Sequence, residues 1–220
     1  MDDLEKSSIA QFNTWAKDYD RKRFWPFYFS NKAVLLALNP RDGASVLDIG
    51  CGTGILLQLL AQSGNDLKLY GLDVASGMAE TAQAKLGKTA EICQGSASHL
   101  PYDDCSFEYV TCSTSFHHYS EPQKALCEMF RVLKPGGSLI LLDPFTNGIL
   151  RKVICAVLDT LSRETGTNLF TREQMFRMFQ NAGFCLIEHN TYLYYKLMTT
   201  GVKSSEICDN AASQNQELTL

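Results

Sequence analysis

The chain has 220 residues, of which 45% are hydrophobic and 20% charged, and its formal net charge is −4. This length and composition predict one soluble α/β domain with appendages. They exclude a general attraction for nucleic acid, because no Lys/Arg cluster offsets the negative charge. No apolar run reaches membrane-spanning length and the first residues, MDDLEKSS, are acidic and polar, so we expect neither a transmembrane segment nor a secretory signal.

The eight cysteines are scattered along the chain, and none forms a C-x-x-C pair. This spacing gives no support to a zinc site or to a redox dithiol. Scattered thiols in a chain without a secretory signal favour a reducing compartment. We therefore predict a cytoplasmic protein without a metal site.

Residues 1–40 are predicted to form a helical cap. Apolar side chains recur at helical spacing from Ile9 to Tyr19, and the aromatic segment Phe24–Phe29 follows. The rings of this segment either pack on the domain or line a substrate pocket, and both interpretations stay open.

Residues 41–143 alternate between strand and helix patterns. Strands are predicted at Ala44–Ile49, Leu67–Leu72, Ala90–Gln94, Phe107–Ser113 and Ser138–Asp143. The helices between them are expected at Thr53–Ser63, behind a cap at Ser76, and behind a capping box at Ser120–Gln123 that contains a first-turn proline. This alternation predicts a Rossmann-like, doubly wound, mostly parallel sheet with helices on both faces.

Residues 144–202 are predicted to hold an insertion and the last strands of the sheet. Ile149–Leu161 reads as a strongly apolar helix, and a capping box at Thr171–Gln174 opens the next helix. Phe184–Glu188 and Thr191–Leu197 complete a seven-stranded sheet with an antiparallel closing strand. Residues 1–202 would then be one domain, and the polar segment 203–220 a mobile tail.

A glycine-rich turn, VLDIGCGTG at Val46–Gly54, joins the first strand to the helix behind it. Gly50, Gly52 and Gly54 let the backbone turn tightly and approach a ligand, and the helix points free N–H groups to the same place. The spacing G-x-G-x-G differs from the dinucleotide fingerprint G-x-G-x-x-G. Because Asp48 would repel a phosphate, the turn favours a ligand with a cationic group over a pyrophosphate. A glycine-rich turn with no ligand is the alternative.

The candidate residues of the sheet all lie at or just beyond the carboxyl ends of predicted strands, where doubly wound sheets bind ligands. They include Asp73, which could accept hydrogen bonds from ribose hydroxyls, and Val74 and Met78, which could flank an adenine ring.

Five segments in this order, DIGCGTG, GLDVASGM, QGSASHLPYDDCSFEYV, SFHHY and RVLKPGGSLILLD, resemble the class I S-adenosylmethionine (SAM) methyltransferases. They look most like the small-molecule methyltransferases of ubiquinone and menaquinone biosynthesis. The resemblance is close over about residues 40–143. It implies SAM as the cofactor, S-adenosylhomocysteine as the product, and methyl transfer to a small acceptor.

The resemblance also implies roles for individual residues. Asp48 and the glycine turn would hold the methionine part of SAM, Asp73 the ribose, and the Ser96–Ala97 position the adenine. The residues that we expect around the cofactor are Tyr19, Asp48, Gly50, Cys51, Gly52, Gly54, Asp73, Val74, Met78, Ser96, Ala97 and Ser113. The family usually has Asp where this chain has Ser96, so one charged acceptor is lost and SAM is expected to bind more weakly.

His117 and His118 follow the fourth strand, where acceptor and methyl donor should meet. Either imidazole could act as a general base, because it titrates near neutrality. The alternative is that one histidine has a structural role. Positioning of nucleophile and donor can supply much of the rate of methyl transfer without a base.

Two other functions remain open at this stage: a regulatory SAM-binding protein without methyl transfer, and a protein methyltransferase. An oligomer is also compatible with the sequence. We expect Phe24–Phe29 and Ile149–Leu161 to pack over the SAM pocket as a lid that excludes water, which implies an apolar or aromatic acceptor.

Overall fold

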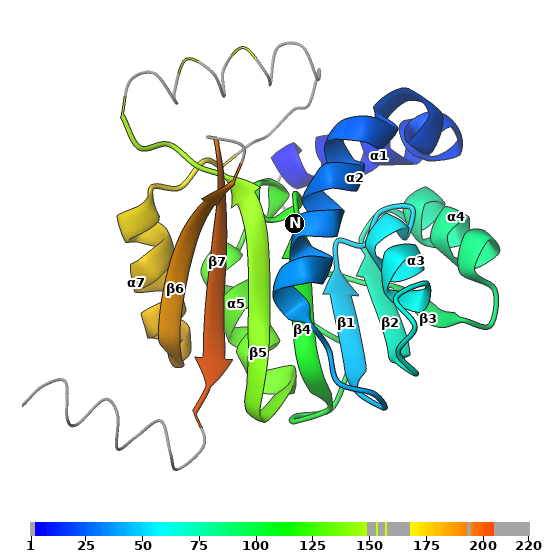
Figure 1. Cartoon of the computed structure of the whole chain (residues 1–220). Helices are drawn as coiled ribbons and strands as arrows, with labels where there is room; N and C mark the ends of the chain where they lie inside the picture. The colour runs from blue at the N-terminus through cyan, green and yellow to red at the C-terminus, as the bar shows by residue number, and fades with distance from the viewer. Residues whose placement is uncertain (1–2, 149–152, 154–156, 158–167, 193–194, 205–220) are drawn as a thin grey trace, which may run out of the picture.

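The computed structural model describes residues 3–148, 153, 157, 168–192 and 195–204, and Figure 1 shows how their helices and strands are arranged. Its sheet has seven strands in the order β3-β2-β1-β4-β5-β7-β6. The strands are β1 (Ser45–Ile49), β2 (Lys68–Asp73), β3 (Ala90–Gln94), β4 (Phe107–Ser113), β5 (Leu133–Pro144), β6 (Phe184–Tyr192) and β7 (Lys196–Lys203). The first five strands pair in parallel, and β7 runs antiparallel to both β5 and β6. The predicted doubly wound sheet with its antiparallel closing strand is confirmed.

Helices cover both faces of this sheet (Figure 1). They are α1 (Asp3–Trp15), α2 (Tyr19–Leu38), α3 (Ile55–Ala61), α4 (Ser76–Leu86), α5 (Pro122–Val132) and α7 (Arg172–Ala182), with 3-10 turns at Ala16–Asp18 and Phe116–His118. Side chains of α2, α3 and α4 form one apolar layer with the sheet, and those of α5 and α7 form the other. Strand β1 is buried along its whole length because both layers cover it. Each fully buried Leu or Ile contributes roughly 1.5–3 kcal/mol to this core.

Local capping differs from the prediction at two helices. Ser76 is the first residue of α4 rather than its cap, and Ala75 takes the cap position. Glu121 caps α5 without a side-chain hydrogen bond, so the capping box predicted at Ser120 is wrong, although Pro122 lies in the first turn as expected. The capping box at Thr171 is confirmed, since Thr171 and Gln174 bond reciprocally to each other's backbone N–H groups.

Several boundaries also move. Helix α3 begins at Ile55, because Gly54 before it is left-handed. The α5 helix ends at Val132, and β5 starts at Leu133 rather than Ser138. Thr191 and Tyr192 belong to β6, and β7 extends from Lys196 to Lys203, so Lys203 is strand rather than tail. The predicted helix Ile149–Leu161 lies outside the described residues, apart from Val153 and Val157.

Candidate active site

The glycine turn lies at the carboxyl end of β1, and its three glycines have distinct surroundings. All three have positive φ angles, +70° at Gly50, +55° at Gly52 and +78° at Gly54. A Cβ on Gly50 would meet Ser115 Oγ at 2.3 Å, and one on Gly54 would meet Leu86 Cδ1 at 2.9 Å. A Cβ on Gly52 would find no atom within 4 Å. Gly50 and Gly54 therefore allow close packing inside the protein, whereas Gly52 borders open space that a ligand can fill.

Two buried carboxyl groups flank this turn. Asp48 is 3% exposed and accepts a hydrogen bond from Thr111 Oγ1 at 2.8 Å. The pKa of Asp48 is raised to about 7, mainly by burial and to a smaller extent by the charge of Asp73, while the Thr111 hydrogen bond opposes the shift.

Asp73 ends the neighbouring strand β2 and is 8% exposed. Its oxygens accept from the backbone N–H groups of Gly52 at 2.8 Å and Ala75 at 2.9 Å. Burial raises the pKa of Asp73 to about 6, although both hydrogen bonds favour the ionised form. These bonds fix the carboxylate beside the glycine turn.

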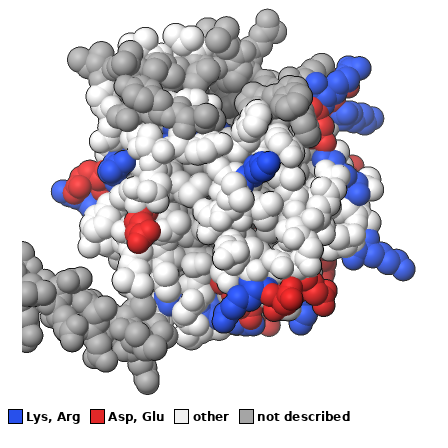
Figure 2. Space-filling view, viewed as in Figure 1, with Lys and Arg blue, Asp and Glu red and all other residues white. Residues whose placement is uncertain are grey.

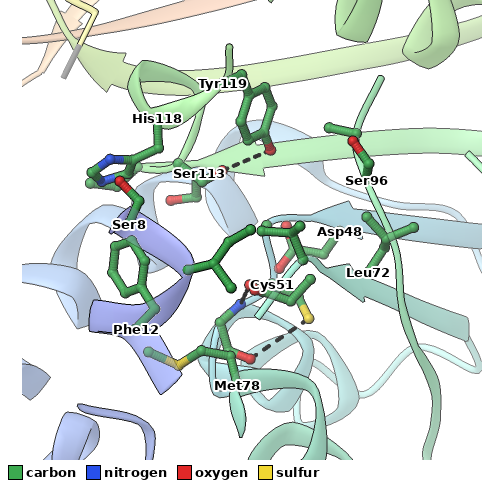
Figure 3. A pocket seen from close by; sticks show the side chains of 18 of the residues that line it. Ser8, Phe12, Asp48, Cys51, Leu72, Met78, Ser96, Ser113, His118 and Tyr119 are labelled. Carbon is green, nitrogen blue, oxygen red and sulfur yellow. Dashed lines mark hydrogen bonds between the residues drawn. The ribbon is translucent and has the colours of Figure 1, made fainter. Parts of the chain in front are cut away.

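A cavity of about 1060 Å³, including its opening to solvent, begins at these two carboxyls and runs past the carboxyl ends of β3 and β4. Figure 3 shows Ser113, His118 and Tyr119 along one wall, Ser8 and Phe12 beside His118, and Ser96 and Leu72 on the opposite side. The residues of the cavity wall are Ser8, Ile9, Phe12, Tyr19, Asn31, Asp48, Gly50, Cys51, Gly52, Thr53, Ile55, Leu72, Asp73, Val74, Met78, Gly95, Ser96, Ala97, Ser98, Ser113, Thr114, Ser115, His118, Tyr119, Ser120, Glu121 and Ala125. The cavity thus lies where doubly wound sheets bind ligands.

The loop after β3 forms one end of the cavity through Ser96, Ala97 and Ser98. The hydroxyls of Ser96 and Ser98 lie 3.0 Å apart and can bond to each other. Two α5 side chains hold the continuation of this loop. Glu128 accepts from the Leu100 N–H at 2.8 Å, and Arg131 donates to the carbonyls of Leu100 and Tyr102.

Helix α1, part of the predicted helical cap, closes the cavity from the other side. Asn13 accepts from the Gly77 N–H at the start of α4 at 2.8 Å. Ile9, Phe12 and Tyr19 pack against a small core formed by Ala16, Ala75 and Met78. This contact brings Ser8, Ile9 and Phe12 into the cavity wall. The helical periodicity of Ile9 and Phe12 was visible in the sequence, but their packing partner was not.

The two adjacent histidines have different surroundings. His117 is 2% exposed, and its Nδ1 lies 2.9 Å from Oδ1 of Asp143, which is 1% exposed. His118 lines the cavity, and its ring lies 5.1 Å from the Phe12 ring and 4.1 Å from the His117 ring, centroid to centroid. The 3-10 turn Phe116–His118 therefore directs one imidazole to the core and the other to the cavity.

The residues predicted to surround the cofactor line the cavity, with the exception of Gly54, which packs against α4. Of the two histidines, only His118 reaches the cavity wall. Two further wall residues were not among those expected around the cofactor: Asn31 comes from α2, and Thr114 directly follows β4. No motif marks them.

The cavity fits SAM by its own chemistry. The open side of Gly52 allows close approach of a ligand, the carboxyls of Asp48 and Asp73 suit its cationic and hydroxylated parts, and Leu72 and Met78 offer apolar contact to a flat ring. Asp73 keeps lone pairs for ribose hydroxyls, because each carboxylate oxygen can accept more than one hydrogen bond.

The face shown in Figure 2 carries both Lys/Arg and Asp/Glu side chains, mostly away from its centre. The described side chains drawn in this view therefore form no large patch of positive charge that would attract a polyanion. None of the described helices is long and apolar enough to cross a membrane.

A family model described as "Methyltransferase domain" matches residues 47–141. Demethylmenaquinone methyltransferase of Thermotoga maritima is 30% identical over 207 residues, which cover 82% of this chain and 89% of that protein. The same enzyme of Bacillus mycoides is 33% identical over 130 residues, or 57% of this chain and 53% of that protein, so this match spans about half the length of the relative.

Solved structures share the fold. A SAM-dependent methyltransferase of Thermotoga maritima superimposes with a TM-score of 0.72 at 22% identity, covering 88% of this chain and 98% of the other. A phosphoethanolamine N-methyltransferase of Haemonchus contortus, solved with S-adenosylhomocysteine, gives a TM-score of 0.68 at 19% identity over 80% of this chain and 52% of the other.

Proposed function

Because the chain belongs to the SAM-dependent methyltransferase family that includes the demethylmenaquinone methyltransferases, we propose that it methylates a small aromatic or apolar acceptor. The observation that carries this proposal is one continuous cavity. It joins Asp48 and Asp73 at one end to His118 at the other. A cofactor and a small acceptor can meet in such a space, since reaction requires nucleophile and donor to be held within contact distance.

SAM, when bound, supplies an activated methyl group on a sulfonium. Asp48 and the backbone of Gly50–Gly52 would hold its cationic amino acid part, and Asp73 would accept from the ribose hydroxyls. The loop at Ser96–Ser98 would border the adenine, with Leu72 and Met78 against its faces. Ser96 would accept from the adenine amino group without a charge, so this contact would be weaker than one to a carboxylate.

We assign the role of general base to His118 rather than His117, since only His118 lines the cavity. His117 would act through its neighbour. The Asp143 carboxylate accepts from its Nδ1–H, and the fixed imidazole then supports the His118 ring at 4.1 Å. An imidazole that titrates near neutrality raises the rate of methyl transfer only where the acceptor is a poor nucleophile in its protonated form.

Phe12 of α1 and Tyr19, the first residue of α2, would exclude water from the site. The lid expected from Phe24–Phe29 and Ile149–Leu161 stays a prediction, because most of these side chains lie outside the part that the structure describes. Phe29, at the edge of the first segment, is 48% exposed. No disulfide joins the cysteines that the structure describes, which agrees with a reducing cytoplasmic location.

Calorimetric titration with SAM tests the cofactor assignment. Asp73→Ala should lower the affinity about 10- to 100-fold, because hydrogen bonds to charged groups contribute roughly 1.5–3 kcal/mol each. Asp103→Ala, at an exposed position remote from the cavity, is the matched control and should bind SAM as the wild type does. Equal affinity of the Asp73 variant and the wild type would refute the assignment.

Formation of S-adenosylhomocysteine from SAM separates an enzyme from a SAM-binding regulator. We expect formation that depends on a small aromatic acceptor such as demethylmenaquinol. SAM binding without turnover on any small acceptor would favour the regulator, and turnover only on protein extracts would favour a protein methyltransferase.

A further inference from the structure

A buried lysine lies behind the acceptor end of the cavity. Lys196, the first residue of β7, is 3% exposed. Its Nζ donates to Thr114 Oγ1 at 3.0 Å and to Ser30 Oγ at 2.8 Å. Thr114 lies in the cavity wall, and Ser30 precedes the wall residue Asn31. A cation is therefore held one side chain away from the space where an acceptor would bind.

The direction of the hydrogen bond from Lys196 determines what Thr114 can do. A lysine ammonium has only donors, so Thr114 Oγ1 accepts, and its own hydrogen must point elsewhere. Thr114 Oγ1 makes no other hydrogen bond within the described ranges. Since the residue lines the cavity, the hydroxyl can donate to a ligand there. The neighbouring ammonium polarises this hydroxyl and strengthens it as a donor.

The backbone at Thr114 provides a second observation. Its φ is +57°, an unusual conformation for a β-branched residue. Its N–H donates to the Leu142 carbonyl at 2.7 Å, which fixes this conformation at the end of β4. Strained backbone of this kind clusters at functional sites.

A neighbouring hydroxyl also lacks a partner. Ser113 Oγ is buried and has no hydrogen-bond partner among the described residues, although Ser113 lines the same cavity. Buried hydroxyls are bonded in most proteins, so this atom is available to bond a ligand or a water in the cavity. Figure 3 shows Ser113 on the wall that also holds His118.

We propose that Thr114, polarised by Lys196, is the acceptor-oxygen subsite, and that it selects acceptors whose oxygen carries negative charge, such as a phenolate, enolate or carboxylate. The positive charge behind Thr114 disfavours acceptors that present an ammonium group. This inference rests on the proposed methyltransferase function. It adds a specificity-determining pair, Thr114 and Lys196, that no sequence motif marks.

Calorimetry on the protein loaded with S-adenosylhomocysteine tests this subsite with three probes, benzoate, phenol and benzylamine. Wild-type protein should bind benzoate more tightly than phenol, and benzylamine least. Thr114→Val and Lys196→Met should each lower benzoate affinity at least tenfold, and Thr114→Ser should retain it because the hydroxyl remains. Thr199→Val, a change at a buried β7 hydroxyl that pairs with His189, is the matched control and should bind benzoate as the wild type does.

Binding of S-adenosylhomocysteine is measured first, in the wild type and in each variant. A wild type that does not bind it refutes the proposed function. Intact binding with no preference for benzoate over benzylamine, or with equal benzoate affinity in Thr114→Val, overturns the subsite alone. Intact cofactor binding in each variant also shows that a loss of benzoate affinity does not come from unfolding.

Discussion

His117 and Asp143 form a buried pair, with Nδ1 and Oδ1 2.9 Å apart, while the adjacent His118 faces the cavity. The second carboxyl oxygen of Asp143 has no hydrogen-bond partner among the described residues. Among the described residues, His117 therefore provides the hydrogen bond that offsets the cost of burying the Asp143 carboxylate away from water. The two histidines of the same short turn thus serve different purposes.

Substitutions of Asp143 and His118 should separate an effect on protein stability from an effect on the rate of methyl transfer. Asp143→Asn is expected to lower the free energy of unfolding by about 1–3 kcal/mol, because it weakens a buried charge-assisted hydrogen bond, and to leave S-adenosylhomocysteine affinity unchanged. His118→Ala should leave stability within about 1 kcal/mol. It should lower kcat for methyl transfer about 10²- to 10⁴-fold if proton removal limits the rate. Urea titration and single-turnover kinetics measure the two effects, and full activity of His118→Ala would remove the base from the mechanism.

The raised pKa values of Asp48 and Asp73 predict that SAM affinity depends on pH. Both carboxyls must be ionised to complement the ligand. Affinity should therefore fall as the pH is lowered from 8 through about 7, where Asp48 gains its proton, to about 6, where Asp73 follows. Calorimetric titrations with SAM between pH 5.5 and 8 measure this affinity. An affinity that does not change with pH would contradict the prediction.

The same shifts predict the pH dependence of stability without ligand. The folded protein holds protons on Asp48 and Asp73 at pH values where the unfolded chain has lost them. The free energy of unfolding should therefore fall as the pH rises from about 4 to about 7. Asp48→Asn should remove much of this slope and stabilise the protein at pH 8 by up to roughly 4 kcal/mol, while weakening SAM binding. Urea titration of the wild type and Asp48→Asn across this pH range measures how the free energy of unfolding changes with pH. The same slope in both proteins would contradict the prediction.

Gly50 and Gly52 offer a matched pair of substitutions in one turn. Both alanine variants carry the strain of a positive φ, roughly 1–2 kcal/mol. Gly50→Ala adds a collision with Ser115 Oγ, so it should lower the free energy of unfolding more than Gly52→Ala. Gly52→Ala places a methyl group in open space at the cavity and should mainly lower SAM affinity. Thermal unfolding and calorimetry distinguish the two, and a stable Gly50 variant with normal SAM binding would show that the turn adapts.

Ser96 tests the path of the adenine loop. If its hydroxyl occupies the position that accepts from the adenine amino group, Ser96→Asp should bind SAM as tightly as the wild type or up to about tenfold more tightly, since a charged acceptor is stronger. Calorimetry at pH 8 measures the change. A large loss of affinity would mean that the loop places another group against the adenine.

The carboxyl ends of the strands were predictable from the sequence, because strand periodicity and turn residues are local properties. Asp48, Asp73 and Ser96 lie at or just beyond the carboxyl ends of predicted strands, and parallel strands bring these ends to one edge of a sheet whatever their distance along the chain. The same logic correctly predicted the order of strand–helix units and the antiparallel closing strand. Helix caps were less predictable, as Ser76 shows, since a cap depends on backbone angles that side-chain preference alone does not determine.

Only the tertiary structure decided which side chains share the cavity. His117 and His118 are equivalent in sequence, and the choice between them depends on Asp143, 26 residues from His117. Lys196 meets Thr114 across 82 residues, because β7 inserts next to β5 and begins where β4 ends. Phe12 reaches the cavity because α1 docks on α4 through Asn13. These contacts depend on packing between distant elements, which leaves no periodic pattern in the chain.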